Sequence, residues 1–121
     1  MPKILIADDE IYSLRLLQMT LKKTDCDLVV CKNGREAVDQ AVDELPDLIV
    51  MDVMMPVLDG LAALAELKAN EKTAAIPVIM LTAKGQTLTR TEARQSGAEH
   101  FLTKPFSPTN LLEEVRKLLP S

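Results

Sequence analysis

Residues 47–60 have the sequence DLIVMDVMMPVLDG, in which a short apolar run ends at a carboxylate. The run 48–51 is apolar at every position, as expected of a parallel strand that is covered on both faces. Asp52 follows the run directly, and Asp59-Gly60 ends the stretch with two residues that are typical of a turn. We therefore expect a buried strand that ends at an acidic side chain, followed by a turn with no further role.

Similar short runs recur along the chain, each followed by a longer stretch with helical spacing of apolar residues. They lie at 4–7, 28–31, 78–81 and 100–102, and the last, which begins with His100, is the shortest and least apolar. Five strand–helix units in alternation predict an α/β fold with a five-stranded parallel sheet and right-handed crossovers. Ligands of such sheets bind beyond the carboxyl ends of the strands, so we expect the functional residues directly after the strands.

The expected helices differ in how apolar they are. Leucines at 14, 17 and 21 form a stripe on the first helix, and the last helix has a similar stripe between 111 and 119. Segment 86–95 is different, because Leu88 and Ala93 are its only apolar residues. We interpret this segment as a helix that is weakly held against the sheet.

Composition limits the possible functions. The chain has 121 residues, 47% of them hydrophobic, which suits one domain over 1–121 with a sizeable core. A net charge of −4 argues against direct nucleic-acid binding, and an aromatic content of 2% removes most stacking platforms for bases or flavins. No apolar run reaches the roughly 20 residues of a membrane span, and two cysteines support neither a disulfide framework nor a zinc site. We expect a cytoplasmic protein that does not insert into membranes.

Several strands lead into residues that can do chemistry. The first is followed by Asp8 and Asp9, the third by Asp52, the fourth by Thr82 and the fifth by Lys104. Each has an ordinary alternative: Asp9 as a helix cap, Asp52 or Thr82 as turn or cap residues, Lys104 as part of an exposed turn. In a parallel sheet all of them would share one edge, where uncompensated carboxylates would repel one another.

A divalent cation would resolve that repulsion. Mg²⁺ takes carboxylate, water and phosphate oxygens as ligands, and a metal with a lysine, a hydroxyl donor and an acceptor carboxylate can transfer a phosphoryl group. Carboxylates also serve as nucleophiles that form aspartyl phosphates. Because Asp8 and Asp9 are paired and Asp52 stands on another strand, we infer that the pair holds the metal and that Asp52 accepts the phosphoryl group. His100, Met54 and Met55 are expected to be ordinary strand or packing residues.

With these residues in view, the chain resembles the receiver domain of two-component response regulators along nearly its whole length. The motifs are ILIADDE at 4–10, DLIVMDVMMPVLDG at 47–60, VIMLTA at 78–83 and HFLTKPF at 100–106. Asp52, Thr82 and Lys104 follow one another at intervals of 30 and 22 residues, as in that family. The resemblance implies the flavodoxin-like (βα)5 fold with strand order 2-1-3-4-5.

The resemblance also implies a phosphorylation site. Asp52 would be the phosphoacceptor, supplied by the phosphohistidine of a sensor histidine kinase or of a phosphotransfer protein. Asp9 would bind Mg²⁺ directly and Asp8 largely through water. Asp52 and the backbone carbonyl of Met54 would complete the protein ligands of the metal.

Further roles follow from the same resemblance. Lys104 would pair with one phosphoryl oxygen, and Thr82 would donate its hydroxyl to another. Phe101 holds the aromatic switch position and would rotate into space that Thr82 leaves, which makes the switch one of packing because Phe has no hydroxyl. Pro105 would follow a cis peptide bond. Lys84, together with Met54, would tune the lifetime of the phosphate.

The resemblance implies that the protein is a signalling switch that controls a partner protein or an attached effector domain. It implies no enzymatic activity other than slow self-catalysed phosphotransfer and dephosphorylation. Asn110 and Glu114 depart from the residues that DNA-binding relatives tend to have on the face used for dimerisation. This departure favours a stand-alone or differently coupled receiver.

Three alternatives remain. A Mg²⁺-dependent phosphatase of the haloacid-dehalogenase type would need D-x-D-x-T after the first strand, where this chain has Asp8-Asp9-Glu10. A nucleotide or flavin carrier would need a glycine-rich phosphate loop, which is absent from the sequence. A phosphate-independent interaction module would have the same fold, although here no residue of the acceptor set is missing.

Overall fold

The computed structural model describes residues 1–83, 92 and 95–120. Strands and helices alternate along them, and the helices and strands have the following bounds: β1 Lys3–Ala7, α1 Ile11–Leu21, the 3₁₀ turn η1 Lys22–Thr24, β2 Asp27–Cys31, α2 Gly34–Glu44, β3 Leu48–Asp52, α3 Gly60–Ala69, β4 Val78–Ala83, β5 His100–Lys104 and α5 Pro108–Leu118. The five predicted strands are therefore confirmed to within two residues. Segment 86–95, expected to form a weakly held helix, lies almost wholly outside the described residues.

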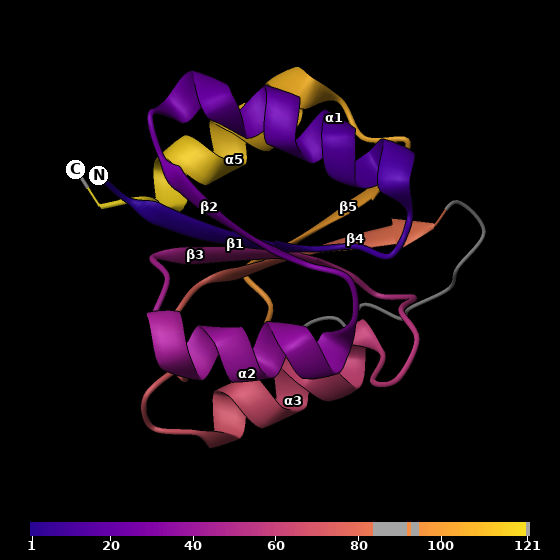
Figure 1. The fold of residues 1–121 in the computed structure, drawn as a ribbon, viewed down its shortest axis with the longest axis vertical. Coiled ribbons are helices and arrows are strands. Elements are labelled where there is room, and N and C mark those ends of the chain that lie inside the picture. Colours follow the sequence, from indigo (N-terminus) through magenta and orange to yellow (C-terminus); the bar gives the residue numbers. More distant parts are fainter. Residues whose placement is uncertain (84–91, 93–94, 121) are drawn as a thin grey trace.

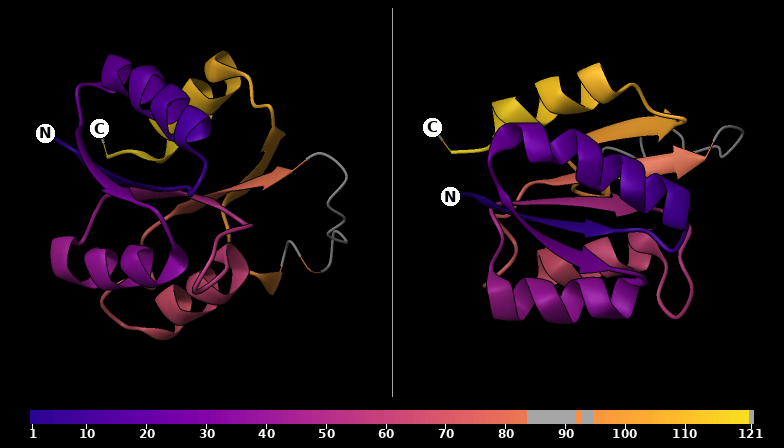
Figure 2. Two further views of the ribbon diagram at one scale, coloured as in Figure 1. Left: turned by 45° about the vertical axis from the view of Figure 1, so that its right-hand side comes forward. Right: turned by 45° about the horizontal axis from the view of Figure 1, so that its top comes forward.

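All four strand pairings are parallel, and the strand order is β2-β1-β3-β4-β5. Helices α1 and α5 cover one face of this sheet, and α2 and α3 cover the other (Figures 1 and 2). The flavodoxin-like fold and its strand order are thus confirmed. Because the strands are parallel, all their carboxyl ends lie at one edge of the sheet.

The sheet separates two apolar cores, since alternate residues of a strand point to opposite faces. Leu5, Ala7, Ile49 and Met51 pack towards α2 and α3. Ile4, Ile6, Leu48 and Val50 pack with residues of α1 and α5. All five residues of β3 are buried, which explains why its sequence is apolar up to the final Asp52.

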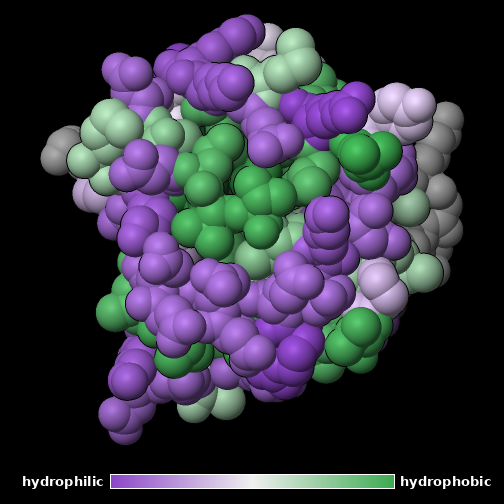
Figure 3. Space-filling view, in the orientation of Figure 1, coloured by the Kyte–Doolittle hydropathy of each residue, from purple (hydrophilic) through white to green (hydrophobic). Residues whose placement is uncertain are grey.

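The outer edge of the sheet is less well covered. Among the described strands, β2 pairs with β1 alone, and Val30 in β2 is 39% exposed. The surface between α1 and α2 shows the largest group of apolar side chains on this mostly hydrophilic face (Figure 3). This edge therefore contrasts with the central strands, whose side chains are buried on both faces.

The leucine stripes of the first and last helices face the core as predicted. Leu14, Leu17 and Leu21 are buried, as are Leu111 and Leu112, whereas the residues at 118 and 119 are half-buried. Helix α1 has Glu10 as its N-cap without a side-chain cap, so the alternative role of Asp9 as a helix cap is wrong. None of the helices that the structure describes is long and apolar enough to cross a membrane.

Asp59-Gly60 does more than make a turn, which corrects the expectation that it has no further role. The Asp59 carboxylate accepts a hydrogen bond of 2.8 Å from the amide of Ala62 and so caps α3. The Gly60 amide donates to the carbonyl of Val53 at 2.7 Å. A Cβ on Gly60 would lie 2.1 Å from the carbonyl oxygen of Asp52, so only glycine fits here.

Candidate functional site

Three carboxylates meet at the carboxyl edge of the sheet. Asp8 and Asp9 follow β1, Asp52 ends the neighbouring β3, and each offers an oxygen within 4.8 Å of the others. Asp8 is fully buried and Asp52 is 5% exposed, whereas Asp9 is exposed to solvent. This arrangement brings together the acidic residues that the sequence predicted to be neighbours.

Lys104 reaches the same place from β5. Its Nζ lies 2.8 Å from Asp8 Oδ2 and 3.0 Å from Asp52 Oδ2. Since β4 lies between β3 and β5, the Lys104 side chain has to cross the end of one strand to make these contacts. A single ammonium therefore joins the carboxyl ends of β1, β3 and β5.

The carboxylate oxygens of the site differ in the hydrogen bonds that they accept. Asp8 Oδ1 accepts from the Glu10 amide at 2.9 Å, and Asp52 Oδ1 accepts from the Met54 amide at 3.3 Å. Asp8 Oδ2 is buried and accepts no well-aligned hydrogen bond from the described residues, although the Lys104 ammonium is close enough to form an ion pair. An incompletely satisfied buried oxygen beside two further carboxylates fits a hard divalent cation, which binds oxygen ligands.

Burial and charge act in opposite directions on the two ionisable partners. Burial raises the pKa of Asp52 above its ordinary value, although the hydrogen bond and charge of Lys104 lower it and the charge of Asp8 raises it further. For Lys104, burial lowers the pKa, but the hydrogen bonds and charges of Asp8 and Asp52 outweigh burial and leave the pKa raised. The lysine is therefore held firmly in its charged form.

The sequence matches the family model of the response regulator receiver domain over residues 4–116. The chain belongs to this family. The receiver domains of two-component response regulators are signalling modules, and the fold and the acidic edge of the sheet agree with that assignment.

Curated relatives of this receiver domain include two bacterial transcriptional regulators. The alkaline phosphatase synthesis transcriptional regulatory protein PhoP of Bacillus subtilis (strain 168) is 38% identical over 117 residues, which are 97% of this chain and 48% of that protein. The DNA-binding dual master transcriptional regulator RpaA of Synechocystis sp. (strain ATCC 27184 / PCC 6803 / Kazusa) is 40% identical over 119 residues, 98% of this chain and 49% of that protein. The chain spans about half the length of these relatives.

Solved structures of other receivers are closely similar. The chemotaxis response regulator CheY4 of Vibrio cholerae has a TM-score of 0.88 and 30% identity, and the match covers 98% of this chain and 99% of that one. The receiver domain of the sensor histidine kinase PA1611 of Pseudomonas aeruginosa PAO1 has a TM-score of 0.89 and 29% identity, covering 99% and 98% of the two chains. That structure has a magnesium ion coordinated in its active-site cleft.

The expected switch residues of this receiver domain lie on β4 and β5. Thr82 Oγ1 donates a long hydrogen bond of 3.5 Å to the carbonyl of Leu102. Phe101 is half-buried and packs against the core on the α2 and α3 side. The Lys104–Pro105 peptide bond is cis, as the resemblance implied. Lys84 lies outside the described residues.

Met54 and Met55 were both expected to be packing residues, and the structure corrects this for one of them. Met55 is 9% exposed and belongs to the core, whereas the Met54 side chain is 60% exposed. Met54 thus touches the site through its backbone amide, and its side chain lies at the surface. The sequence could not reveal this difference in exposure, because both positions hold methionine.

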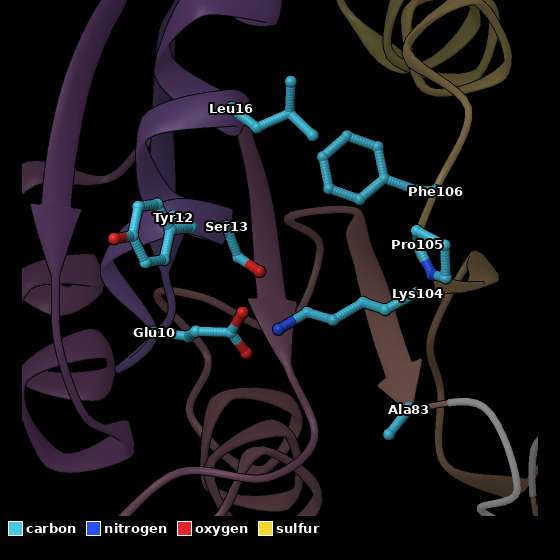
Figure 4. Close-up of a pocket in the computed structure, with 8 residues that line it drawn as sticks. All are labelled: Glu10, Tyr12, Ser13, Leu16, Ala83, Lys104, Pro105 and Phe106. Carbon is cyan, nitrogen blue, oxygen red and sulfur yellow. The ribbon is translucent and has the colours of Figure 1, made fainter.

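A cavity of about 400 Å³ lies beside Lys104, between the start of α1 and the segment that joins β5 to α5. Glu10, Ser13 and Lys104 form its polar wall, and Leu16 and Phe106 form part of its apolar wall (Figure 4). Sequence reasoning identified neither the cavity nor Glu10. The position of Glu10, directly after Asp8-Asp9 in the first strand-end motif, was the only available signal.

Proposed function

We propose that this receiver domain is a phosphorylation-dependent switch in which Asp52 accepts a phosphoryl group from the phosphohistidine of a sensor kinase or of a phosphotransfer protein. The observation that carries the proposal is the convergence of Asp8, Asp9 and Asp52 with Lys104 at one edge of the sheet. These residues come from three strands and supply the acceptor, the metal ligands and the counter-charge of a phosphoryl-transfer site.

Mg²⁺ is the cofactor that this donor set would hold. Asp8, Asp9 and Asp52 would bind it through carboxylate oxygens or intervening water, and the carbonyl of Met54 would be a fourth protein ligand. When bound, the ion neutralises negative charge on the carboxylates and on the incoming phosphoryl oxygens. The incompletely satisfied Asp8 Oδ2 supports this choice, as does the mutual proximity of the three carboxylates.

The chain's own residues would handle the transfer as follows. An Asp52 oxygen forms the new bond to phosphorus while the bond from phosphorus to the donor nitrogen breaks. The Lys104 ammonium, already 3.0 Å from Asp52, turns to a phosphoryl oxygen and offsets the added negative charge. The Thr82 hydroxyl gives up its long bond to Leu102 and donates to another phosphoryl oxygen.

The change of hydrogen-bond partner at Thr82 would transmit phosphorylation to the surface of the domain. Movement of Thr82 towards the phosphate leaves space for the Phe101 ring, and the altered packing shifts a two-state surface that includes β5 and α5. Phe101 lacks a hydroxyl, so packing alone decides between its two positions. Met54 and Lys84 would set the phosphate lifetime by controlling access of water to Asp52.

The output would be a partner protein or an effector domain attached to this single receiver domain. The net charge of −4 argues against direct binding of nucleic acid by the domain itself. On α5, Glu114 pairs with Lys117 at 3.4 Å within its own helix, and the Asn110 amide donates to the Ser107 cap. The residue types at 110 and 114 favour a receiver that stands alone or is coupled in a way that differs from its DNA-binding relatives.

Incubation with acetyl phosphate, read by intact mass, tests the proposed function. We expect a phosphate adduct on the wild type that requires Mg²⁺ and disappears in Asp52→Asn. Asp43→Asn, which removes an exposed carboxylate from α2, is the matched control and should label like the wild type. Labelling of Asp52→Asn at the wild-type level would show that Asp52 is not the acceptor.

A further inference from the structure

The cavity beside Lys104 lies close to the Asp52 carboxylate, because Lys104 contacts both. Lys104 forms part of its wall, and the ammonium of Lys104 is 3.0 Å from the Asp52 carboxylate. In phosphoryl transfer the attacking and leaving atoms stand roughly in line on opposite sides of phosphorus. A donor attacked by Asp52 therefore carries its leaving group away from Asp52, and the cavity in front of Lys104 and the start of α1 is a space next to the Lys104 ammonium that could receive it.

The size and walls of the cavity suit a small flat group. Its volume of about 400 Å³ is in the lower part of the range for small-molecule sites. Leu16 and Phe106 provide apolar surface at one end, while the Glu10 carboxylate and the Ser13 hydroxyl point towards the Lys104 ammonium (Figure 4). An aromatic ring with a polar edge matches this combination of walls.

The charge of the cavity wall should favour one class of phosphodonor over another. The Glu10 carboxylate makes no hydrogen bond or ion pair with any described residue, so its charge is not neutralised within the wall. Among the described residues that line the cavity, Lys104 is the one cation, and it is already shared by Asp8 and Asp52. A leaving group that departs as an anion is repelled by Glu10, whereas an N–H group can donate a hydrogen bond to it.

We propose that this cavity is the leaving-group subsite of the receiver and that Glu10 is the residue that selects a phosphorylated imidazole over an acyl phosphate. The inference rests on the proposed role of Asp52 as phosphoacceptor. Asp52 forms its bond to phosphorus as the P–N bond breaks, and the electron pair of that bond stays on the ring nitrogen. The other ring nitrogen keeps its proton and donates it to Glu10 in a hydrogen bond, so a neutral imidazole leaves.

The acyl phosphate follows the same route with a different charge. Its P–O bond breaks, the electron pair stays on oxygen, and a carboxylate anion departs past Glu10. The two donors share Asp52, the metal and Lys104, and they differ in what they present to the cavity. The ratio of their rates therefore isolates the effect of Glu10 from any general damage to the site.

The test measures the rate of Asp52 labelling by N-phosphorylimidazole and by acetyl phosphate, each with saturating Mg²⁺, in three variants. Glu10→Gln should lower the ratio of the first rate to the second by about 10-fold, which corresponds to loss of one charge interaction of roughly 1.4 kcal/mol. Glu10→Asp keeps the charge and should keep most of the ratio. Glu113→Gln removes an exposed carboxylate from α5 and should leave the ratio unchanged.

The outcomes separate this inference from the function on which it rests. An unchanged ratio in Glu10→Gln, with Asp52 still labelled by both donors, overturns the role of Glu10 and leaves the phosphoacceptor proposal intact. If the ratio falls by the same factor in Glu113→Gln, the effect comes from the net charge of the protein, and the proposed role of Glu10 is wrong. If neither donor labels Asp52 in the wild type, both proposals fail.

Discussion

Two positively charged side chains of this molecule each lie between two carboxylates, one on the surface and one at the site. Arg35 lies 3.2 Å from Asp39 and 3.0 Å from Glu66, and the side chains of all three are 44% to 66% exposed. In the second group the Lys104 side chain is 15% exposed, and those of Asp8 and Asp52 are 0% and 7% exposed.

The two groups differ in their exposure to solvent. Water and salt screen the Arg35 group, and exposed pairs of this kind contribute little to stability. The Lys104 group is shielded from water, so each charge there depends on its partners and its loss leaves the others uncompensated. The same pattern of charges is thus incidental in one place and available for chemistry in the other.

Lys104→Met should have the largest effect on stability. It leaves Asp8 and Asp52 facing each other without a cation, and we expect the free energy of unfolding to fall by about 2–3 kcal/mol in metal-free buffer. Urea denaturation in the presence of a chelator measures this. Lys3→Met, which removes a cation from the more exposed pair with Glu44, is the control. An effect no larger than that of the control would show that burial does not distinguish the two groups.

Mg²⁺ should stabilise the protein through the carboxylates beside Lys104 and not through those beside Arg35. If the carboxylates bind the ion, Mg²⁺ at a hundred times its dissociation constant stabilises the native state by about 2.7 kcal/mol, and a chelator removes the gain. Thermal unfolding with and without Mg²⁺ measures the effect. Asp9→Asn should reduce it, whereas Asp39→Asn should retain it in full. A gain that survives in Asp9→Asn would place the ion elsewhere.

Burial separates the two cysteines in the same way. Cys31 is fully buried, and burial together with the charge of Glu36 raises the pKa of its thiol from 9.0 to about 12. Because alkylation requires the thiolate, folded protein at pH 8 should modify at Cys31 about a thousandfold more slowly than unfolded protein. Peptide mass spectrometry after iodoacetamide treatment measures this, and half-buried Cys26 should react first. Comparable rates at both sites would contradict the prediction.

Arg35→Met should have the smallest effect. The Arg35 group is exposed, so the midpoint of urea denaturation should shift by no more than the error of the measurement at physiological salt. Any difference from the wild type at low salt should vanish as sodium chloride is added. A salt-resistant loss comparable to that of Lys104→Met would contradict the view that only buried groups depend on their partners.

Much of the fold could be predicted because its signals are local. The apolar run 48–51 lies on a strand buried on both faces, and the leucines of α1 face the core as their spacing indicated. The carboxylates could be placed together because parallel strands end at one edge. The order of the strands came from the family resemblance, since nothing in the spacing of residues determines it.

The rest depended on contacts between distant residues. The sequence marks Asp59-Gly60 as a turn, but the cap on α3 and the close approach to Asp52 exist only once the chain is folded. Met54 and Met55 are identical in type and differ in exposure because one points outwards from the loop. The cavity that contains Glu10 forms between α1 and the start of α5, which lie almost a hundred residues apart.

The fit of Gly60 against Asp52 has a mechanical consequence. Because the Gly60 backbone touches the Asp52 carbonyl and its amide bonds to Val53, the first turn of α3 and the end of β3 form one rigid joint. A displacement of α3 relative to Asp52 would therefore have to break this contact or move β3, whose five residues are all buried. If Asp52 is the phosphoacceptor as proposed, we therefore expect the movement that follows phosphorylation to be directed away from α3, towards β4 and β5.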